Sequence, residues 1–338
     1  MTVPALAGLR AALPDASIDL VVGSWNRAIA SAIPGITRVE TLDASWLARG
    51  RDGLGPIGLA RRAAAWRSRR YDLAINFEPD IRTNLALAAA GARRTAGFAS
   101  GGGGAVLDVL LDHDPSAHTA DNALRLVEAA VGGVPPEAGS SNALPRLQLP
   151  DAARTEAAAL LRRLDGTRKI GVHVSGGRAI KQWPEARFRD VAASLVRDRS
   201  AAIVLTGTPD DRAQIALVRD ALPADRVVDL SGGADLLTVA GVLQQLDLLV
   251  TGDTGPMHLA HAVGTPVVAV FGPSDPVRYG PRGLRDRIVR VDLPCSPCNR
   301  IRLPPARCTG HTPDCLAGVE TAAVLAAIDD VLGEGDGS

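Results

Sequence analysis

Two short segments combine the residue types that bind phosphate. The first follows an apolar run at residues 246–250 and leads through a tight turn into a helix. Asp253 or Thr254 can cap this helix. Gly252 and Gly255 let the backbone approach a ligand without a Cβ. The free N–H groups and positive end of a helix attract anions, so the turn predicts an anion site suited to a diphosphate. The alternative is a well-capped helix that binds nothing.

The second segment, residues 173–188, also follows an apolar run. It contains two adjacent glycines, then Arg178 and Lys181, and then a Trp-Pro pair that opens a helix. A glycine loop with two cations predicts a phosphate clamp, and a solvated surface loop is the alternative. Lys169 and Lys181 are the only lysines of the chain, so each is a candidate for a specific role. Codon bias toward arginine is the alternative explanation for the scarcity of lysine. Trp183 is expected in the core.

Both segments belong to a repeating pattern of strands and helices. In the second half of the chain, short β-branched runs alternate with helical stretches, which predicts a parallel sheet covered on both faces. The expected strands there are 169–174, 201–206, 226–230, 246–250 and 266–271, and the expected helices are 184–197, 210–221, 235–245, 256–263 and a closing helix at 318–332. The first half shows strands at 18–22 and 71–77 and a helix at 83–90.

A stretch rich in Gly, Pro and Ser at residues 132–150 has the composition of a linker. It predicts two α/β domains, residues 1–150 and 151–338, which agrees with the roughly two domains expected for a chain of 338 residues. Ligands of open parallel sheets bind beyond the carboxyl ends of the strands. We therefore expect the site in a cleft between two Rossmann-like domains.

The overall composition excludes several classes of protein. Lys and Arg number 37, as do Asp and Glu, and a net charge near zero argues against a general nucleic-acid binder. No apolar run approaches the ~18 residues that span a bilayer, and no signal-peptide pattern is visible. We therefore expect a cytoplasmic protein.

Four cysteines, Cys295, Cys298, Cys308 and Cys315, lie close together near the end of the chain. In a reducing compartment such a cluster points to metal more than to disulfides. The C-x2-C spacing of the first pair suits zinc, the second pair is loosely spaced, and His311 is a substitute ligand. We expect a structural zinc, with free thiols or disulfides as alternatives, and no catalytic metal.

The segment 253–281, DTGPMHLAHAVGTPVVAVFGPSDPVRYGP, resembles the signature of glycosyltransferase family 9, the heptosyltransferases of lipopolysaccharide synthesis. The K-x-W-P element at 181–184 and the strand and loop LTGTPDD at 205–211 are similar to that family too. The resemblance covers nearly the whole chain. It implies a GT-B fold with an N-terminal acceptor domain and a C-terminal donor domain. It further implies inverting, metal-independent transfer of a sugar from a nucleotide-diphospho-sugar, typically ADP-heptose, to a lipid-linked saccharide.

The resemblance also implies roles for individual residues. Asp253 would contact the sugar hydroxyls, the backbone amides after it would hold the diphosphate, and Lys181 would neutralise the leaving phosphate beside Arg178. Asp210 or Asp211 is a weaker candidate for the ribose hydroxyls. Fixed dipoles and a cation stabilise the charge of a departing diphosphate, so Lys181 and Asp253 are the expected catalytic residues. The expected donor-binding residues are Ser175, Gly176, Gly177, Arg178, Lys181, Asp210, Asp253, Thr254, Gly255, Pro256, Met257 and His258.

The chain departs from the family pattern at its start. Family members open with an apolar strand and a glycine loop ending in Gly-Asp, and that Asp is regarded as the general base. Here residues 3–14 already match the run that follows this loop. We expect the natural start to lie upstream, because the missing strand would be central in a doubly wound sheet. The alternative is a true short form without the base. For the function, the alternatives are a nucleotide-sugar-binding protein without transfer activity and a nucleotide-sugar epimerase, which shares the fold.

Two segments of the first half concern the acceptor. Residues 60–71 carry five arginines around Trp66, so this helix could lie on an anionic membrane surface, as a peripheral contact near a lipid-linked acceptor. A solvated helix face is the commoner alternative. Polar residues also end the strand 71–77, where they could bind the acceptor sugar or form a turn and a helix cap. They are Asn76, Glu78, Asp80, Arg82 and Asn84.

Overall fold

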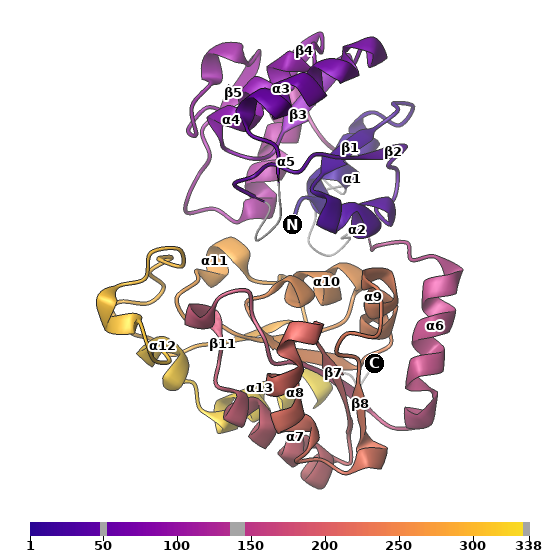
Figure 1. The fold of residues 1–338 in the computed structure, drawn as a ribbon, viewed down its shortest axis with the longest axis vertical. Coiled ribbons are helices and arrows are strands. Elements are labelled where there is room, and N and C mark those ends of the chain that lie inside the picture. Colours follow the sequence, from indigo (N-terminus) through magenta and orange to yellow (C-terminus); the bar gives the residue numbers. More distant parts are fainter. Residues whose placement is uncertain (48–52, 136–145, 334–338) are drawn as a thin grey trace. The chain divides into compact units, whose positions relative to one another are not determined.

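The computed structural model describes residues 1–47, 53–135 and 146–333, and the chain divides into two units, Met1–Gln148 and Leu149–Ser338 (Figure 1). The division lies two residues before the boundary expected from the sequence. Residues 136–145 of the expected linker lie outside the described residues. Every pairing between strands in the described ranges is parallel, as the alternating pattern predicts.

The first unit contains two small parallel sheets that share no hydrogen-bonded strand pair in its described residues. One sheet joins β1 (Asp19–Val22) and β2 (Arg38–Thr41), and the other has the order β3-β4-β5 (Leu73–Asn76, Arg94–Phe98 and Val109–Leu111). Helix α1 packs against α5, and α3 packs against α4. The helices of this unit are α1 (Val3–Ala12), α2 (Arg27–Ser31), α3 (Pro56–Ala64), α4 (Ile81–Ala89) and α5 (Thr119–Val131).

The second unit is built on one six-stranded sheet with the order β11-β10-β9-β6-β7-β8. The chain enters at β6, moves outward through β7 and β8, and then returns to the other side of β6 with β9. The strand order therefore reverses between β6 and β9, and ligands of doubly wound sheets bind at such a switch point. The strands are β6 (Lys169–His173), β7 (Ala202–Thr206), β8 (Val227–Asp229), β9 (Leu248–Gly252), β10 (Val267–Val270) and β11 (Arg287–Val289).

Helices cover both faces of this sheet. Helices α7, α8 and α13 contact one another or the sheet on one side, and α6, α9 and α10 form the other layer. A single apolar cluster joins the strands to α7 and α13, with Phe188, Val191 and Ile328 among its buried members. The helices of this unit are α6 (Asp151–Leu161), α7 (Glu185–Arg199), α8 (Arg212–Arg219), α9 (Leu236–Gln244), α10 (Gly255–Val263), α11 (Pro276–Tyr279), α12 (Asp314–Ala317) and α13 (Thr321–Gly333).

The structure confirms the expected strands and helices of the second half to within a few residues. In the first half it confirms β1, β3 and α4 and adds elements that the sequence pattern did not indicate. The unanticipated strands are β2, β4 and β5 in the first unit and β11 in the second. Within the described ranges, no helix combines the length and the apolar character needed to cross a bilayer.

Candidate functional site

An ion pair joins the two segments that the sequence singles out. Lys181 Nζ lies 2.6 Å from Asp253 Oδ2, and only 21% and 10% of these two side chains are exposed. Lys181 follows β6 and Asp253 follows β9, so the pair spans the switch point of the sheet. The two residues expected to be catalytic are thus brought together at the carboxyl edge where a doubly wound sheet binds its ligand.

The loop that carries Lys181 is fixed at both ends. Gln182 Nε2 donates to the carbonyl oxygen of Gly176 at 2.7 Å, and the backbone N–H of Lys181 donates to the carbonyl oxygen of Arg178 at 3.0 Å. Trp183 is 1% exposed, and its indole N–H donates to the carbonyl oxygen of Val319 at 3.1 Å. Trp183 is therefore a core residue, as expected, and its burial fixes the position of Lys181 two residues earlier.

Helix α10 begins beside this pair with its first turn uncapped. Thr254 occupies the N-cap position but makes no side-chain hydrogen bond to the helix. Its hydroxyl lies 3.0 Å from the hydroxyl of Thr251, and the Asp253 carboxylate is paired with Lys181. The expectation that Asp253 or Thr254 caps the helix is therefore wrong, because both side chains have other partners. The first-turn amides are left available to an anion.

Space is also open at this turn. A Cβ added to Gly255 would meet no atom within 4 Å, so the space beside this residue is open. Met257 is fully buried, which leaves only its backbone to face a ligand. Pro256 lies in the first turn, and His258 is half-buried just after it. The turn thus has the features that the sequence predicted for an anion site, except for the cap.

Polar side chains form a row across three neighbouring strands at the same edge. His173 on β6 is in register with Thr206 on β7 and with Thr251 on β9. The two loops attach to this polar row (Thr206, His173 and Thr251): Thr254 bonds to Thr251, and Ser175 Oγ lies 3.2 Å from His173 Nε2. The row holds both loops in place.

His173 is buried in this row and titrates far from its usual range. Desolvation by burial lowers its pKa to about 4, against smaller opposing contributions from Asp211 and Thr206. The imidazole is therefore neutral at neutral pH. His173 opens the segment 173–188, but the local sequence pattern assigns it no role. One feature of the sequence could have indicated the polar row: each of the three strands carries a polar residue at or next to its carboxyl end.

The remaining predicted donor residues lie around the same edge. Ser175 is buried, Gly177 is exposed, and Arg178 is half-buried with no ion pair to any side chain in the described ranges. Asp211 Oδ2 accepts hydrogen bonds from the backbone N–H and the hydroxyl of Thr208, both at 2.7 Å. Asp210 is exposed and bonds to no other described residue, so it is the better placed of the two carboxylates for a ligand.

The four cysteines do not form a metal site in this structure. Among the described residues, which include all four, no group of three or more His, Cys, Asp or Glu side chains could hold a metal ion. All four are free thiols; Cys295 is exposed, whereas Cys315 is buried in α12. The other three cysteines lie near enough to Cys315 to contribute to the raised pKa of its thiol, and the structural zinc stays a prediction.

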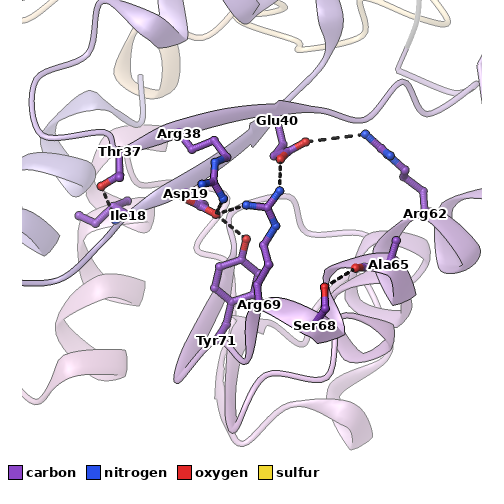
Figure 2. A network of polar contacts seen from close by, with 10 residues as sticks. All are labelled: Ile18, Asp19, Thr37, Arg38, Glu40, Arg62, Ala65, Ser68, Arg69 and Tyr71. Atoms are coloured by element: carbon purple, nitrogen blue, oxygen red, sulfur yellow. Dashed lines mark hydrogen bonds and ion pairs between the residues drawn. The ribbon is translucent and has the colours of Figure 1, made fainter.

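Two arginines of residues 60–71, Arg62 and Arg69, pair with carboxylates of the first unit (Figure 2), while the other three are exposed. Arg69 reaches Asp19 Oδ2 at 3.3 Å and Glu40 Oε1 at 2.5 Å, and Arg62 lies 3.7 Å from Glu40 Oε2. Tyr71 donates its hydroxyl to Asp19 Oδ2 at 2.7 Å. Burial and the nearby Asp19 raise the pKa of Tyr71 to about 12. These contacts tie β1, β2 and the start of β3 together.

The one tryptophan of this segment, Trp66, is buried. Its side chain is buried in a cluster with Leu59 and Ala63, and Arg67 Nε donates to the carbonyl oxygen of Ala89 at 2.9 Å. A buried tryptophan does not insert into a membrane. Trp66 therefore supplies no membrane contact, but Arg61 and Arg70 are exposed, and the membrane contact of this helix stays a prediction.

The polar residues after β3 form a connected network. Asn76 Nδ2 donates to Asn84 Oδ1 at 2.7 Å, and Asn84 Nδ2 donates to the carbonyl oxygens of Phe98 and Gly102 at 3.0 and 2.8 Å. Asp80 caps α4 by accepting from the backbone N–H of Arg82. Asn84 is fully buried, so Asn76 and Asn84 hold the loop in place. Asp80 forms the helix cap that the alternative to a sugar site predicted.

Sequence comparison places the chain in a family. The profile of "Glycosyltransferase family 9 (heptosyltransferase)" matches residues 60–304. The chain belongs to glycosyltransferase family 9. Lipooligosaccharide heptosyltransferase 2 of Haemophilus influenzae is 30% identical over 114 residues, 33% of each protein. Lipopolysaccharide heptosyltransferase 1 of Pseudomonas aeruginosa is 28% identical over 181 residues, 54% of this chain and 47% of the relative. The matches thus span about a third to a half of these curated relatives.

Solved structures of family 9 members share the fold along nearly the whole chain. A glycosyl transferase of Veillonella parvula superposes with a TM-score of 0.83 at 24% identity and covers 98% of this chain and 93% of the other. The Escherichia coli ADP-heptose lipopolysaccharide heptosyltransferase II gives 0.78 at 20% identity, with coverage of 99% and 95%. The family 9 chain described here therefore has the GT-B fold that the motifs implied.

Proposed function

We propose that this family 9 chain transfers a sugar from a nucleotide-diphospho-sugar to an acceptor hydroxyl, with the donor held by the second unit. The observation that carries the proposal is the Lys181–Asp253 pair beside the uncapped first turn of α10. A cation, a carboxylate and free amides converge where a doubly wound sheet binds nucleotides. Membership in family 9 supports the same reaction class.

The chemistry follows from these groups. The acceptor oxygen attacks the anomeric carbon and its proton passes to water, the bond from that carbon to the phosphate oxygen breaks, and the electron pair leaves with the diphosphate. The amides after Thr254 and the cations of Lys181 and Arg178 stabilise the charge that develops on this leaving group. These groups supply the electrostatic stabilisation that a divalent metal gives in other transfer enzymes, so we propose transfer without a catalytic metal.

Asp253 has a second role in this proposal. In the free protein its carboxylate accepts from Lys181 Nζ at 2.6 Å. An arriving diphosphate carries more negative charge than one carboxylate, so it attracts Lys181 away from Asp253. The released carboxylate can then accept hydrogen bonds from sugar hydroxyls. One ion pair would thus exchange for two ligand contacts, one to phosphate and one to sugar.

For the finer identity of the substrates, we propose ADP-heptose as donor and a lipid-linked saccharide of the cell envelope as acceptor. Two solved structures of the Escherichia coli heptosyltransferase WaaC, at TM-scores of 0.69 and 0.71, contain ADP and ADP-2-deoxy-2-fluoro heptose. Asp210, exposed after β7, is the candidate for the ribose hydroxyls. The polar network after β3 is the candidate for the acceptor sugar, and peripheral contact with the inner face of the inner membrane would bring the acceptor within reach.

Calorimetric titration of the full chain with ADP, UDP, GDP and ADP-heptose tests the donor site. Selective binding of the adenine nucleotides, weakened at least about 10-fold in Lys181→Ala, supports the proposal, because one lost cation contact to phosphate is worth about 1.5–3 kcal/mol. Arg189→Ala, which removes an exposed cation on α7 paired with its neighbour Asp190, is the control and should bind normally. Absence of nucleotide binding by the folded wild type would overturn the proposal. Tight binding without transfer to any saccharide acceptor would favour a binding protein.

A further inference from the structure

The hydroxyl of Ser175 is held by a buried histidine whose proton position is fixed by its surroundings. His173 Nδ1 lies 3.0 Å from the carbonyl oxygen of Thr206, which can only accept a hydrogen bond, so Nδ1 carries the ring proton. The ring is neutral at neutral pH because burial lowers its pKa to about 4. Nε2 is therefore bare and can only accept. Ser175 Oγ, 3.2 Å away, must donate its single proton to Nε2.

This arrangement leaves Ser175 Oγ with lone pairs and no proton to give. A phosphate oxygen also offers only lone pairs, so the two oxygens cannot form a hydrogen bond with each other. A ligand hydroxyl can donate to Ser175. The loop lies against the start of α10, since a Cβ added to Gly176 would lie 3.7 Å from the Thr254 methyl group. Ser175 Oγ thus offers an acceptor, like the Asp253 carboxylate, beside the donor amides at the start of α10.

A serine bonded to a histidine can instead be a nucleophile activated by a base. Efficient bases have a pKa near the operating pH. Burial places the pKa of His173 at about 4, so at neutral pH the ring takes a proton from Ser175 poorly. The pair is therefore suited to fixing the direction of the hydroxyl and not to activating it.

We propose that Ser175 determines specificity in the donor site by accepting a hydrogen bond from a ligand hydroxyl, and that His173 is the positioning residue that turns the Ser175 proton away from the ligand. This inference rests on the proposed function, because it requires a nucleotide-sugar at the switch point. It differs from the role that the sequence suggested for Ser175, which was as part of a phosphate-binding loop. The hydroxyl belongs either to the ribose or to the transferred sugar.

The test compares wild type and Ser175→Ala by titration with three ligands. ADP-heptose carries both sets of hydroxyls, ADP carries those of ribose only, and 2′,3′-dideoxy-ADP keeps the diphosphate without ribose hydroxyls. Loss of one hydrogen bond should weaken binding by about 2- to 10-fold. If Ser175→Ala weakens the binding of ADP-heptose alone, the hydroxyl that donates to Ser175 belongs to the transferred sugar. If it weakens the binding of ADP-heptose and ADP but not that of dideoxy-ADP, the hydroxyl belongs to the ribose. Equal loss for all three, or no loss for any, overturns the inference.

Three further variants separate positioning from folding. Ser194, like Ser175, is 8% exposed, but its hydroxyl bonds to Asp198 on α7, so Ser194→Ala is the matched control and should bind all three ligands normally. His173→Leu should reproduce the ligand pattern of Ser175→Ala, whereas His173→Gln, which restores an acceptor oxygen, should recover most of the affinity. Full affinity in a folded His173→Leu variant would overturn the role of His173. Absence of any nucleotide binding by the wild type overturns the proposed function as well.

Discussion

The Lys181–Asp253 pair makes a quantitative prediction about stability. At 2.6 Å the Coulomb energy of two unit charges is about 6 kcal/mol at an effective dielectric constant near 20, and about 1.6 kcal/mol in water. Desolvation of the partly buried partners offsets much of this gain. We expect a net coupling of about 1–3 kcal/mol. Because Asp253 is the more buried partner, Lys181→Met should cost more, about 2–3 kcal/mol, than Asp253→Asn, about 1–2 kcal/mol.

A double-mutant cycle measures this coupling. Urea unfolding of the wild type, both single variants and the Lys181→Met/Asp253→Asn double variant gives four free energies, and the double variant should lose less than the sum of the singles. The only other lysine, Lys169, provides a matched control. Its Nζ lies 3.9 Å from Asp165 Oδ1, which is 72% exposed, so that cycle should give less than about 0.5 kcal/mol. Equal coupling in the two cycles would refute the argument that the site pair is a formed, partly buried contact.

Three more predictions concern buried titratable and polar groups. Burial holds the pKa of His173 at about 4, below its usual 6.5, so the unfolded state takes up the proton first as the pH falls. The free energy of unfolding should therefore fall by about 2 kcal/mol between pH 7 and pH 5. Unfolding curves of His173→Gln should show a smaller fall over the same range. Tyr71→Phe should cost about 1–2 kcal/mol in urea unfolding, because Asp19 loses a hydrogen bond, and an unchanged midpoint would contradict the network of Figure 2. Burial raises the pKa of the Cys315 thiol, so Cys315 should react with iodoacetamide more slowly than exposed Cys295; equal rates by mass spectrometry would contradict the described burial.

The parts of the fold that could be predicted are those whose pattern is local. Strands β7, β9 and β10 are runs of mostly β-branched and aliphatic residues, because a parallel sheet covered on both faces buries every one of their positions. Strands β2 and β4 read RVET and RTAGF, and each begins with an exposed arginine. Such short, partly exposed strands resemble loops in sequence, and only their pairing with a neighbour defines them.

The same distinction applies to the site. Glycine, proline and charged residues in two loops indicate an anion site by their types alone, and the structure places both loops at one edge. The Lys181–Asp253 contact depends on the strand order, and the polar row depends on the register of three strands, so neither follows from local spacing. The absence of a side-chain cap on α10 also depends on a contact between strand and loop that local spacing does not show. A local rule predicts that Thr254 caps α10, but its hydroxyl meets Thr251 instead.

The contiguity of the second unit has a consequence for how such proteins can diversify. Every residue expected to hold the donor lies between Ser175 and His258, within one sheet that has its own apolar core. Substitutions in the first unit can therefore accumulate without disturbing the switch point between β6 and β9. We therefore expect the second unit to act as an independent module. A chimera that joins this second unit to the first unit of another family 9 protein should keep its nucleotide preference while its acceptor preference changes with the graft.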